Sequence, residues 1–280
     1  MMYTALSPGA LGFQIAFQDA AAVAERNGFK GYWFDIKKDL EPGVAAVQDL
    51  LKRHSLTPAG FGLPVNFRTD DATFLADLEQ LSAHARNAQT LGLERCVTWL
   101  MPASDERTYQ ENFELHTRRL REVAAILRKH NIRLGLEFVG PATMRRGKKY
   151  EFVHNLSQTL DLCNAIGTGN VGLLMDVFHW DVAGQTDADF DLIPGADAVV
   201  LAHVNDAPKG RSPDEQLDNE RGLPGETGVL RIGSFFTGLA KLGYEGPVVV
   251  EPFSAPLKAM PFEAAVAAAM ASLKRVWPKG

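Results

Sequence analysis

The chain has 280 residues, of which 46% are hydrophobic and 22% are charged, a composition typical of an ordinary globular protein rather than a disordered one. Its net charge of −5 argues against a protein whose main partner is nucleic acid, because such proteins usually present a basic surface. No stretch of about 20 apolar residues occurs, so we expect no transmembrane helix.

Short apolar runs alternate with longer amphipathic runs along the chain, a pattern typical of repeated strand–helix units. Helices are expected over Asp71–Leu91 and Asp105–His130, each opening with an acidic residue. The eight strands are expected around Ala10–Phe13, Gly31–Asp35, Ala59–Val65, Cys96–Met101, Arg133–Phe138, Val171–Val177, Ala198–Val204 and Val248–Glu251. Because a (β/α)₈ TIM barrel typically has about 250 residues, we predict one α/β domain of this class over residues 1–280.

One long connection lacks a clear periodicity. It covers Asp206–Gly228, is rich in Pro, Gly and charged residues, and follows the seventh predicted strand. Loops of this length in a compact domain are usually functional or mobile. We therefore expect it to lie on the active face of the barrel.

Four strands end in side chains that can bind a metal ion. Glu137, Asp176, His203 and Glu251 stand in the runs LGLEF, GLLMDVFH, VVLAHVND and VVVEPF. Because all strand C-termini of a TIM barrel open on the same face, we predict that these side chains meet. A buried carboxylate needs a cation, which is either an Arg or Lys partner or a metal ion. Four such residues in successive strands favour one shared metal ion over four separate salt bridges.

The ligand set indicates the kind of metal. Three carboxylates and one imidazole form a hard site of mixed oxygen and nitrogen ligands, unlike the thiolate-rich sites of structural zinc. We predict one divalent ion, Mn²⁺ in the first place, with Mg²⁺, Co²⁺ or Zn²⁺ as alternatives.

The motifs resemble the xylose isomerase-like TIM barrels, a superfamily that includes sugar phosphate isomerases and epimerases, ketose 3-epimerases, inosose dehydratase and endonuclease IV. The similarity runs from GFKGYWFD through LEFVGP, NVGLLMDVFHW, LAHVNDAP and ERGLPGETG to GYEGPVVVEPF. It implies that Glu137, Asp176, His203 and Glu251 bind a single divalent ion, and that Glu137 and Glu251 are the catalytic acid/base pair. The activity it implies is isomerisation or epimerisation of a sugar, sugar phosphate or related keto-polyol through an enediolate.

Further residues are candidates for substrate contact. The resemblance implies this role for His179 and Arg221, whereas a structural histidine and a solvated loop arginine are the competing interpretations. Trp99, at the end of the fourth predicted strand, could form an apolar wall against a sugar ring or pack in the core. The run RRGKK, residues 145–149, could bind an acidic substrate group, although a solvated charge run is the simpler interpretation.

Three alternative functions stay open. A dehydratase of the inosose dehydratase type begins with the same proton abstraction, and nothing in the motifs separates the two outcomes. An endonuclease IV-like nuclease is less well supported, because the segments GLPVNF, TWLMPA and QLDNERG lack the additional histidines that its three zinc ions require. A non-catalytic sugar-binding barrel has little need for two glutamates at the metal.

The expected partners follow from this hypothesis. We expect a small-molecule carbohydrate substrate, no nucleic acid and no membrane, with homo-oligomerisation left open. The start of the sequence lacks the basic region of a signal peptide. Cys96 and Cys163 are too few for a disulfide framework and fit reduced thiols, so we expect a cytoplasmic protein.

Overall fold

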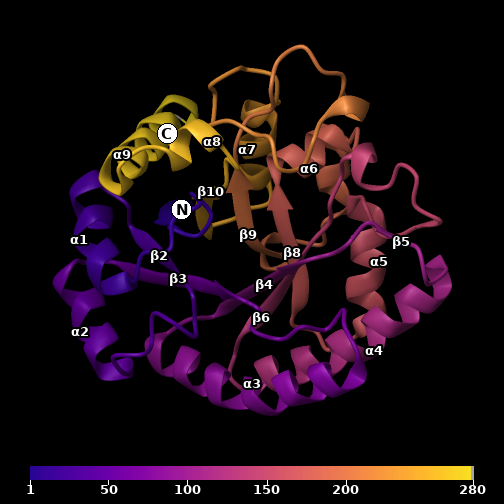
Figure 1. Ribbon diagram of the computed structural model, residues 1–280, viewed down its shortest axis with the longest axis horizontal. Coiled ribbons are helices and arrows are strands. Elements are labelled where there is room, and N and C mark those ends of the chain that lie inside the picture. The colour runs from indigo at the N-terminus through magenta and orange to yellow at the C-terminus, as the bar shows by residue number, and fades with distance from the viewer. Residues whose placement is uncertain (279–280) are drawn as a thin grey trace.

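The computed structural model describes residues 1–278, in which eight parallel strands close into a barrel (Figure 1). Around the barrel the strands follow the order β1, β10, β9, β8, β6, β4, β3, β2, so that each strand pairs with its neighbours in the chain. This confirms the predicted TIM barrel. The strands are β1 (Tyr3–Leu6), β2 (Gly31–Phe34), β3 (Thr57–Gly62), β4 (Arg95–Trp99), β6 (Arg133–Glu137), β8 (Val171–Asp176), β9 (Val199–Val204) and β10 (Pro247–Val250).

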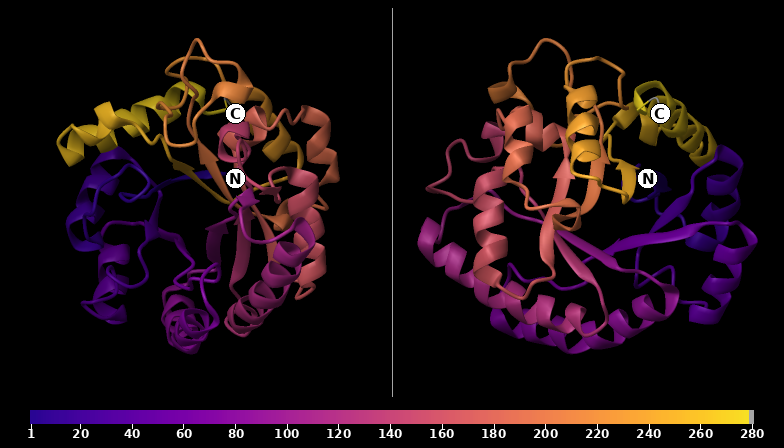
Figure 2. Two further views of the ribbon diagram at one scale, coloured as in Figure 1. Left: turned by 45° about the vertical axis from the view of Figure 1, so that its right-hand side comes forward. Right: turned by 180° about the vertical axis from the view of Figure 1, so that it is seen from behind.

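The helices form the outer layer, and α9 packs beside α1 so that the ring closes (Figure 2). They are α1 (Phe17–Asn27), α2 (Val44–Arg53), α3 (Asp71–Leu91), α4 (Tyr109–Arg128), α5 (Leu156–Ile166), α6 (Val177–Val182), α7 (Ile232–Lys241), α8 (Ala255–Lys258) and α9 (Phe262–Val276). None of the helices within residues 1–278 combines the length and hydropathy needed to cross a membrane.

Short elements lie in the connections. Strands β5 (Ala103–Ser104) and β7 (Tyr150–Glu151) pair antiparallel as a small separate sheet. Four 3₁₀ turns complete the structure, namely η1 (Ala142–Met144), η2 (Asp187–Leu192), η3 (Ala196–Ala198) and η4 (Pro213–Glu215).

The prediction of the first strand was wrong. Strand β1 is Tyr3–Leu6, whereas residues 10–13 lie in consecutive turns. The amides of Leu11 and Phe13 donate to the carbonyls of Ser7 and Pro8, which closes these turns. Gly12 has a φ of 90°, a conformation that a strand does not contain.

The predicted start of the fourth helix was also wrong. Helix α4 begins at Tyr109, four residues after Asp105, with Thr108 as its N-cap. The Thr108 amide donates to the Glu111 carboxylate at 2.8 Å, and the Glu111 amide donates to the Thr108 hydroxyl at 3.4 Å. This reciprocal capping box fixes the helix start. Asp105 instead pairs with Lys148 at 2.7 Å.

The inside of the barrel is packed below the strand C-termini. Gly135 in β6 makes room for this packing, since a Cβ there would lie 3.0 Å from the side chains of Val97 and Val200. The site therefore opens only on the face where the strands end. The buried apolar residues of this inner cluster are Ala5, Ala59, Val97, Leu174, Val200, Leu201 and Val249.

His116 on α4 is a buried ionisable group away from the strand ends. Its Nδ1 lies 2.8 Å from the Asn112 carbonyl, and its ring packs 4.7 Å from the Phe152 ring and 5.4 Å from the Phe67 ring. Burial lowers the pKa of His116 to about 4. The folded protein therefore binds this proton less readily than the unfolded chain, whose histidines titrate near 6.5.

We expect His116 to contribute to acid unfolding. Between pH 6.5 and 4 the unfolded chain binds a proton that the folded protein does not, so stability falls by about 3 kcal/mol as the pH falls through this window. Urea unfolding at pH 7 and pH 4 should show a smaller pH-dependent loss for His116→Phe than for the wild type. His130→Gln, which changes a more exposed histidine, should keep the wild-type loss, and an unchanged loss in His116→Phe would contradict the assignment.

Candidate functional site

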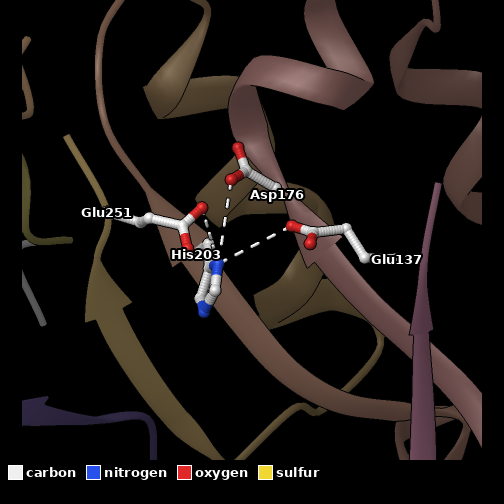
Figure 3. Close-up of side chains that lie close together, drawn as sticks. All are labelled: Glu137, Asp176, His203 and Glu251. Atoms are coloured by element: carbon white, nitrogen blue, oxygen red, sulfur yellow. Dashed lines mark ion pairs between the residues drawn. The ribbon is translucent and has the colours of Figure 1, made fainter. Parts of the chain in front are cut away.

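The four strand-end residues converge at the mouth of the barrel (Figure 3). Glu137 ends β6, Asp176 ends β8, His203 lies near the end of β9 and Glu251 directly follows β10. Each offers one ligand atom, and these atoms all lie within 4.8 Å of one another. The structure thus brings together all four residues that the sequence singles out, here called the acid–histidine cluster.

The imidazole of His203 lies at the centre of this cluster. Its Nδ1 is 3.3 Å from Glu251 Oε2, 3.6 Å from Glu137 Oε1 and 3.8 Å from Asp176 Oδ2. Both His203 Nδ1 and Glu137 Oε1 are buried without a hydrogen-bond partner among residues 1–278. A divalent cation would satisfy both of these buried polar atoms once His203 has released its proton, so these residues fit a metal ion.

The charges of the cluster are strongly coupled. Burial, reinforced by the Glu251 charge, raises the pKa of Glu137 to about 7. Burial opposes ionisation of Glu251 as well, but His203 and Arg221 hold the pKa of Glu251 below its usual value. Burial would lower the pKa of His203, yet the two glutamates raise it to about 10. In the absence of an ion, the two glutamates are therefore unequal, with Glu251 the more acidic.

Asp176 is held in place by its neighbours. Its Oδ1 accepts from the Phe178 amide at 2.7 Å, and the Asn205 side-chain amide donates to both oxygens at 3.1 and 3.2 Å. Asp176 pairs in register with His203, above an irregularity in β8 between Leu173 and Leu174. The carboxylate therefore cannot turn away from the cluster.

Arg221 balances the negative charge. Its Nη1 donates to Asp176 at 2.8 Å and to Glu251 at 3.2 Å, and its Nη2 donates to Asp218 at 2.7 Å. The guanidinium carbon lies 4.5 Å from the centre of the Phe178 ring and 4.7 Å from that of Phe253. Arg221 is only 5% exposed, so it is not a solvated loop arginine.

His179 is a buried neutral imidazole next to this arginine. Its Nε2 lies 3.1 Å from Arg221 Nη2, 3.6 Å from Asp218 and 3.9 Å from Glu137. Burial, followed by the Arg221 charge, lowers the pKa of His179 to about 3. Gly140 is required beside it, because a Cβ there would lie 2.4 Å from the His179 carbonyl oxygen.

A single carboxylate ties the loop that carries Arg221. Asp206, which is fully buried, accepts from the amides of Thr227 at 2.9 Å, Gly228 at 2.7 Å and Leu230 at 3.1 Å. It also pairs with Gly222 in an antiparallel bridge. The loop that the sequence predicts is thus closed at its base, which holds Arg221 against the cluster.

A cavity of about 1030 Å³ lies over the barrel mouth. Glu137, His203 and Glu251 line it, whereas Asp176, His179 and Arg221 do not. Trp99, 37% exposed, forms part of its wall, so this tryptophan is not a core residue. Trp180, by contrast, is fully buried in the core.

Comparison with known proteins identifies the family of the chain. A model of the xylose isomerase-like TIM barrel matches residues 17–276. The chain belongs to this family. A xylose isomerase domain protein from Alicyclobacillus acidocaldarius, 31% identical, superimposes with a TM-score of 0.88 over 99% of this chain and 98% of its own. The IOLI protein with a bound zinc atom superimposes with a TM-score of 0.82 at 18% identity, over 98% of both chains.

Family members of similar sequence are sugar isomerases and epimerases. An inosose isomerase from Bacillus velezensis is 23% identical over 214 residues, which is 75% of this chain and 72% of the relative. A ketose 3-epimerase from Arthrobacter globiformis is 28% identical over 102 residues, or 36% of this chain and 30% of the relative. The four residues of the acid–histidine cluster are placed so that they could hold a metal ion in this xylose isomerase-like barrel.

Three residues at this xylose isomerase-like site were not identified as site residues from the sequence. Asn205 supports Asp176 and directly follows the VVLAHV run, which is a usable signal. Asp218 precedes Arg221 by three residues, but only the folded loop shows that they pair. Arg68 lines the cavity from the loop after β3, and nothing in its sequence context marks it.

Proposed function

We propose that the protein is a divalent-metal-dependent isomerase or epimerase of a sugar, sugar phosphate or related keto-polyol that works by proton transfer next to a carbonyl. The observation that carries this proposal is the placement of two carboxylates. Glu137 and Glu251 approach His203 from opposite sides (Figure 3), and both line the cavity, whereas Asp176 does not.

The acid–histidine cluster would hold the ion, with Asp176 and His203 as anchors and Glu137 and Glu251 as ligands that also face the substrate. When bound, the ion supplies Lewis acidity that makes a substrate C–H next to a carbonyl more acidic. His203 has to release its proton to become a ligand. Mn²⁺ suits this set of ligands, and the zinc in the IOLI protein keeps Zn²⁺ as an alternative.

The chain's own groups would move the proton. One of Glu137 and Glu251 removes a proton from one face of the substrate, and the other returns a proton on the opposite face or at the neighbouring carbon. Glu137 and Glu251 come from different strands on two sides of the cavity floor. Both could therefore reach the planar form of the substrate that remains after a proton is removed. His203 and, after it, Arg221 lower the pKa of Glu251, which favours Glu251 as the first base.

The substrate contacts are part of the same proposal. Trp99 offers an apolar face in the cavity wall against which the carbon side of a sugar ring can pack. Arg221 and His179 do not line the cavity, so they would act on the substrate through the cluster that they contact. Inosose isomerase and ketose 3-epimerase as relatives favour isomerisation or epimerisation over dehydration.

Solvent exchange tests the proposal directly. We expect the metal-loaded protein in D₂O to place deuterium next to the carbonyl of at least one sugar among ketoses, ketose phosphates and inososes, detected by NMR. Protein treated with a chelator should lose this exchange and regain it with Mn²⁺ or Zn²⁺. Absence of exchange in the whole panel, with one ion per chain verified by elemental analysis, would contradict proton transfer as the chemistry.

A further inference from the structure

Arg68 is an arginine in the cavity wall without an ion-pair partner. It lies on the loop that follows β3 and is half-buried. Among residues 1–278, no carboxylate lies within 4.0 Å of its guanidinium nitrogens, which distinguishes it from Arg221. Partly buried cations are usually paired, because removal from water is costly. An unpaired one facing a substrate cavity points to a negative charge on the ligand.

The position of Arg68 is fixed by aromatic and backbone contacts. Its guanidinium carbon lies 4.1 Å from the centre of the Trp99 ring and 4.7 Å from that of Phe67. Its Nη1 donates to the carbonyl oxygen of Trp99. The guanidinium is thus held over the Trp99 ring, while its other N–H groups make no hydrogen bond within the described part of the chain. Such a preorganised fork suits a carboxylate or phosphate.

Arg68 also lies within reach of the reaction site. Trp99, to which it is bonded, pairs in register with Glu137 on the neighbouring strand. The guanidinium is therefore one strand along the barrel rim from the acid–histidine cluster, and both border the same cavity. A ligand that fills this cavity would therefore face both Arg68 and the cluster.

Four acidic residues outside the acid–histidine cluster line the same cavity, namely Asp35, Asp39, Glu41 and Asp77, and within residues 1–278 none of them forms an ion pair with Arg68. The carboxylate of Asp39 accepts from the amides of Phe17 and Asp35 at 2.9 Å, and that of Asp77 accepts from the Asn66 amide at 2.8 Å. These acids are used to fix loops. Lys37 and Lys38 line the cavity on the side of β2, but Asp35, Asp39 and Glu41 line it there too, so Arg68 is the cation of this wall that stands apart from carboxylates.

The basic run after β6 is the competing place for an acidic group, but its members have other partners. Arg145 donates to the carbonyls of Gly140 and Pro141 at 2.7 and 3.2 Å, and Lys148 pairs with Asp105 at 2.7 Å. No residue of this run lines the cavity.

We propose that Arg68 binds an anionic group of the substrate, a phosphate or a carboxylate, at the wall of the cavity beside Trp99. The inference rests on the proposed function and narrows its substrates to acidic sugar derivatives. Arg68 would fix the far end of the substrate, while the acid–histidine cluster acts on the carbonyl end.

Direct binding of simple anions tests this subsite independently of turnover. Calorimetric titration of the metal-loaded protein with inorganic phosphate and, separately, with acetate should show binding of at least one of them. We expect Arg68→Met to weaken it by roughly 10- to 100-fold, as for loss of a charge-assisted hydrogen bond. Arg68→Lys should restore part of the affinity, and Arg86→Met, which changes an exposed arginine on α3, should leave it unchanged.

The outcomes separate the two possible groups and the two proposals. If Arg68→Met loses affinity for phosphate alone, the substrate is a sugar phosphate. If it loses affinity for acetate alone, the substrate is a sugar acid. Wild-type protein that binds neither anion, or Arg68→Met that binds them as tightly as the wild type, would overturn the subsite. If anions bind through Arg68 but no sugar exchanges deuterium, the subsite stands and the isomerase proposal fails.

Discussion

Glu251→Gln and Glu137→Gln should each lower turnover by roughly 10³-fold, because each removes one of the two groups proposed to carry the proton. Glutamine keeps the size of the side chain and an oxygen that can face the ion, but it cannot accept a proton at neutral pH. Both the rate of conversion and the rate of deuterium exchange should fall. Unequal effects on the two rates would show which glutamate removes the proton and which returns it.

Loss of metal has to be separated from loss of the base. Each variant is therefore compared at equal metal content, measured by elemental analysis, and at saturating ion concentration. Glu122→Gln, on the outer face of α4, is the matched control and should retain full activity. Wild-type turnover by either cluster variant at full occupancy would rule out the two-base mechanism.

Arg221→Met should have the largest effect on stability. The arginine is buried between Asp176, Glu251 and Asp218, so its loss removes the nearest counter-charge of Asp176 and Asp218. Breaking a buried ion pair by removing one partner typically costs about 3 to 5 kcal/mol. We expect a loss of this size in urea unfolding of the metal-free protein, together with a fall in kcat/KM.

A divalent ion should partly reverse this loss, because it adds positive charge beside the same carboxylates. Arg231→Met is the matched control. Arg231 also pairs with an aspartate, Asp181, and packs against an aromatic ring, that of Trp180, but it is 42% exposed. Exposed pairs contribute at most about 1 kcal/mol, so this variant should change stability little. Equal losses of unfolding free energy in the two variants would show that Arg221 stabilises the fold no more than an exposed arginine does.

The acid–histidine cluster could be predicted because its signal is local and repeated. Each member stands at the end of an apolar run, and the barrel converts four equivalent sequence positions into one place in space. Trp99 at the cavity wall could be anticipated for the same reason. Its role and that of the cluster in binding stay predictions.

The errors have physical causes. The first strand, Tyr3–Leu6, is short and is followed by an apolar segment that resembles a strand, but Gly12 turns this segment back over the barrel mouth. The start of α4 was misplaced because acidic Asp105 was preferred to the capping box at Thr108. Asp218 and Arg68 were missed because their partners are set by the path of loops, which hydrophobic periodicity does not describe.

The closure of the long loop by Asp206 has a consequence for how ligands come and go. The amides of Thr227, Gly228 and Leu230 all donate to the buried carboxylate of Asp206, so the loop after β9 is held in place on this side of the barrel mouth. The cavity is instead bordered largely by the segments that follow β1, β2 and β3. We therefore expect substrate to enter and product to leave over the N-terminal half of the barrel. Changes in the length of the loops after β1 and β2 would alter the rates of binding and release and leave the acid–histidine cluster in place.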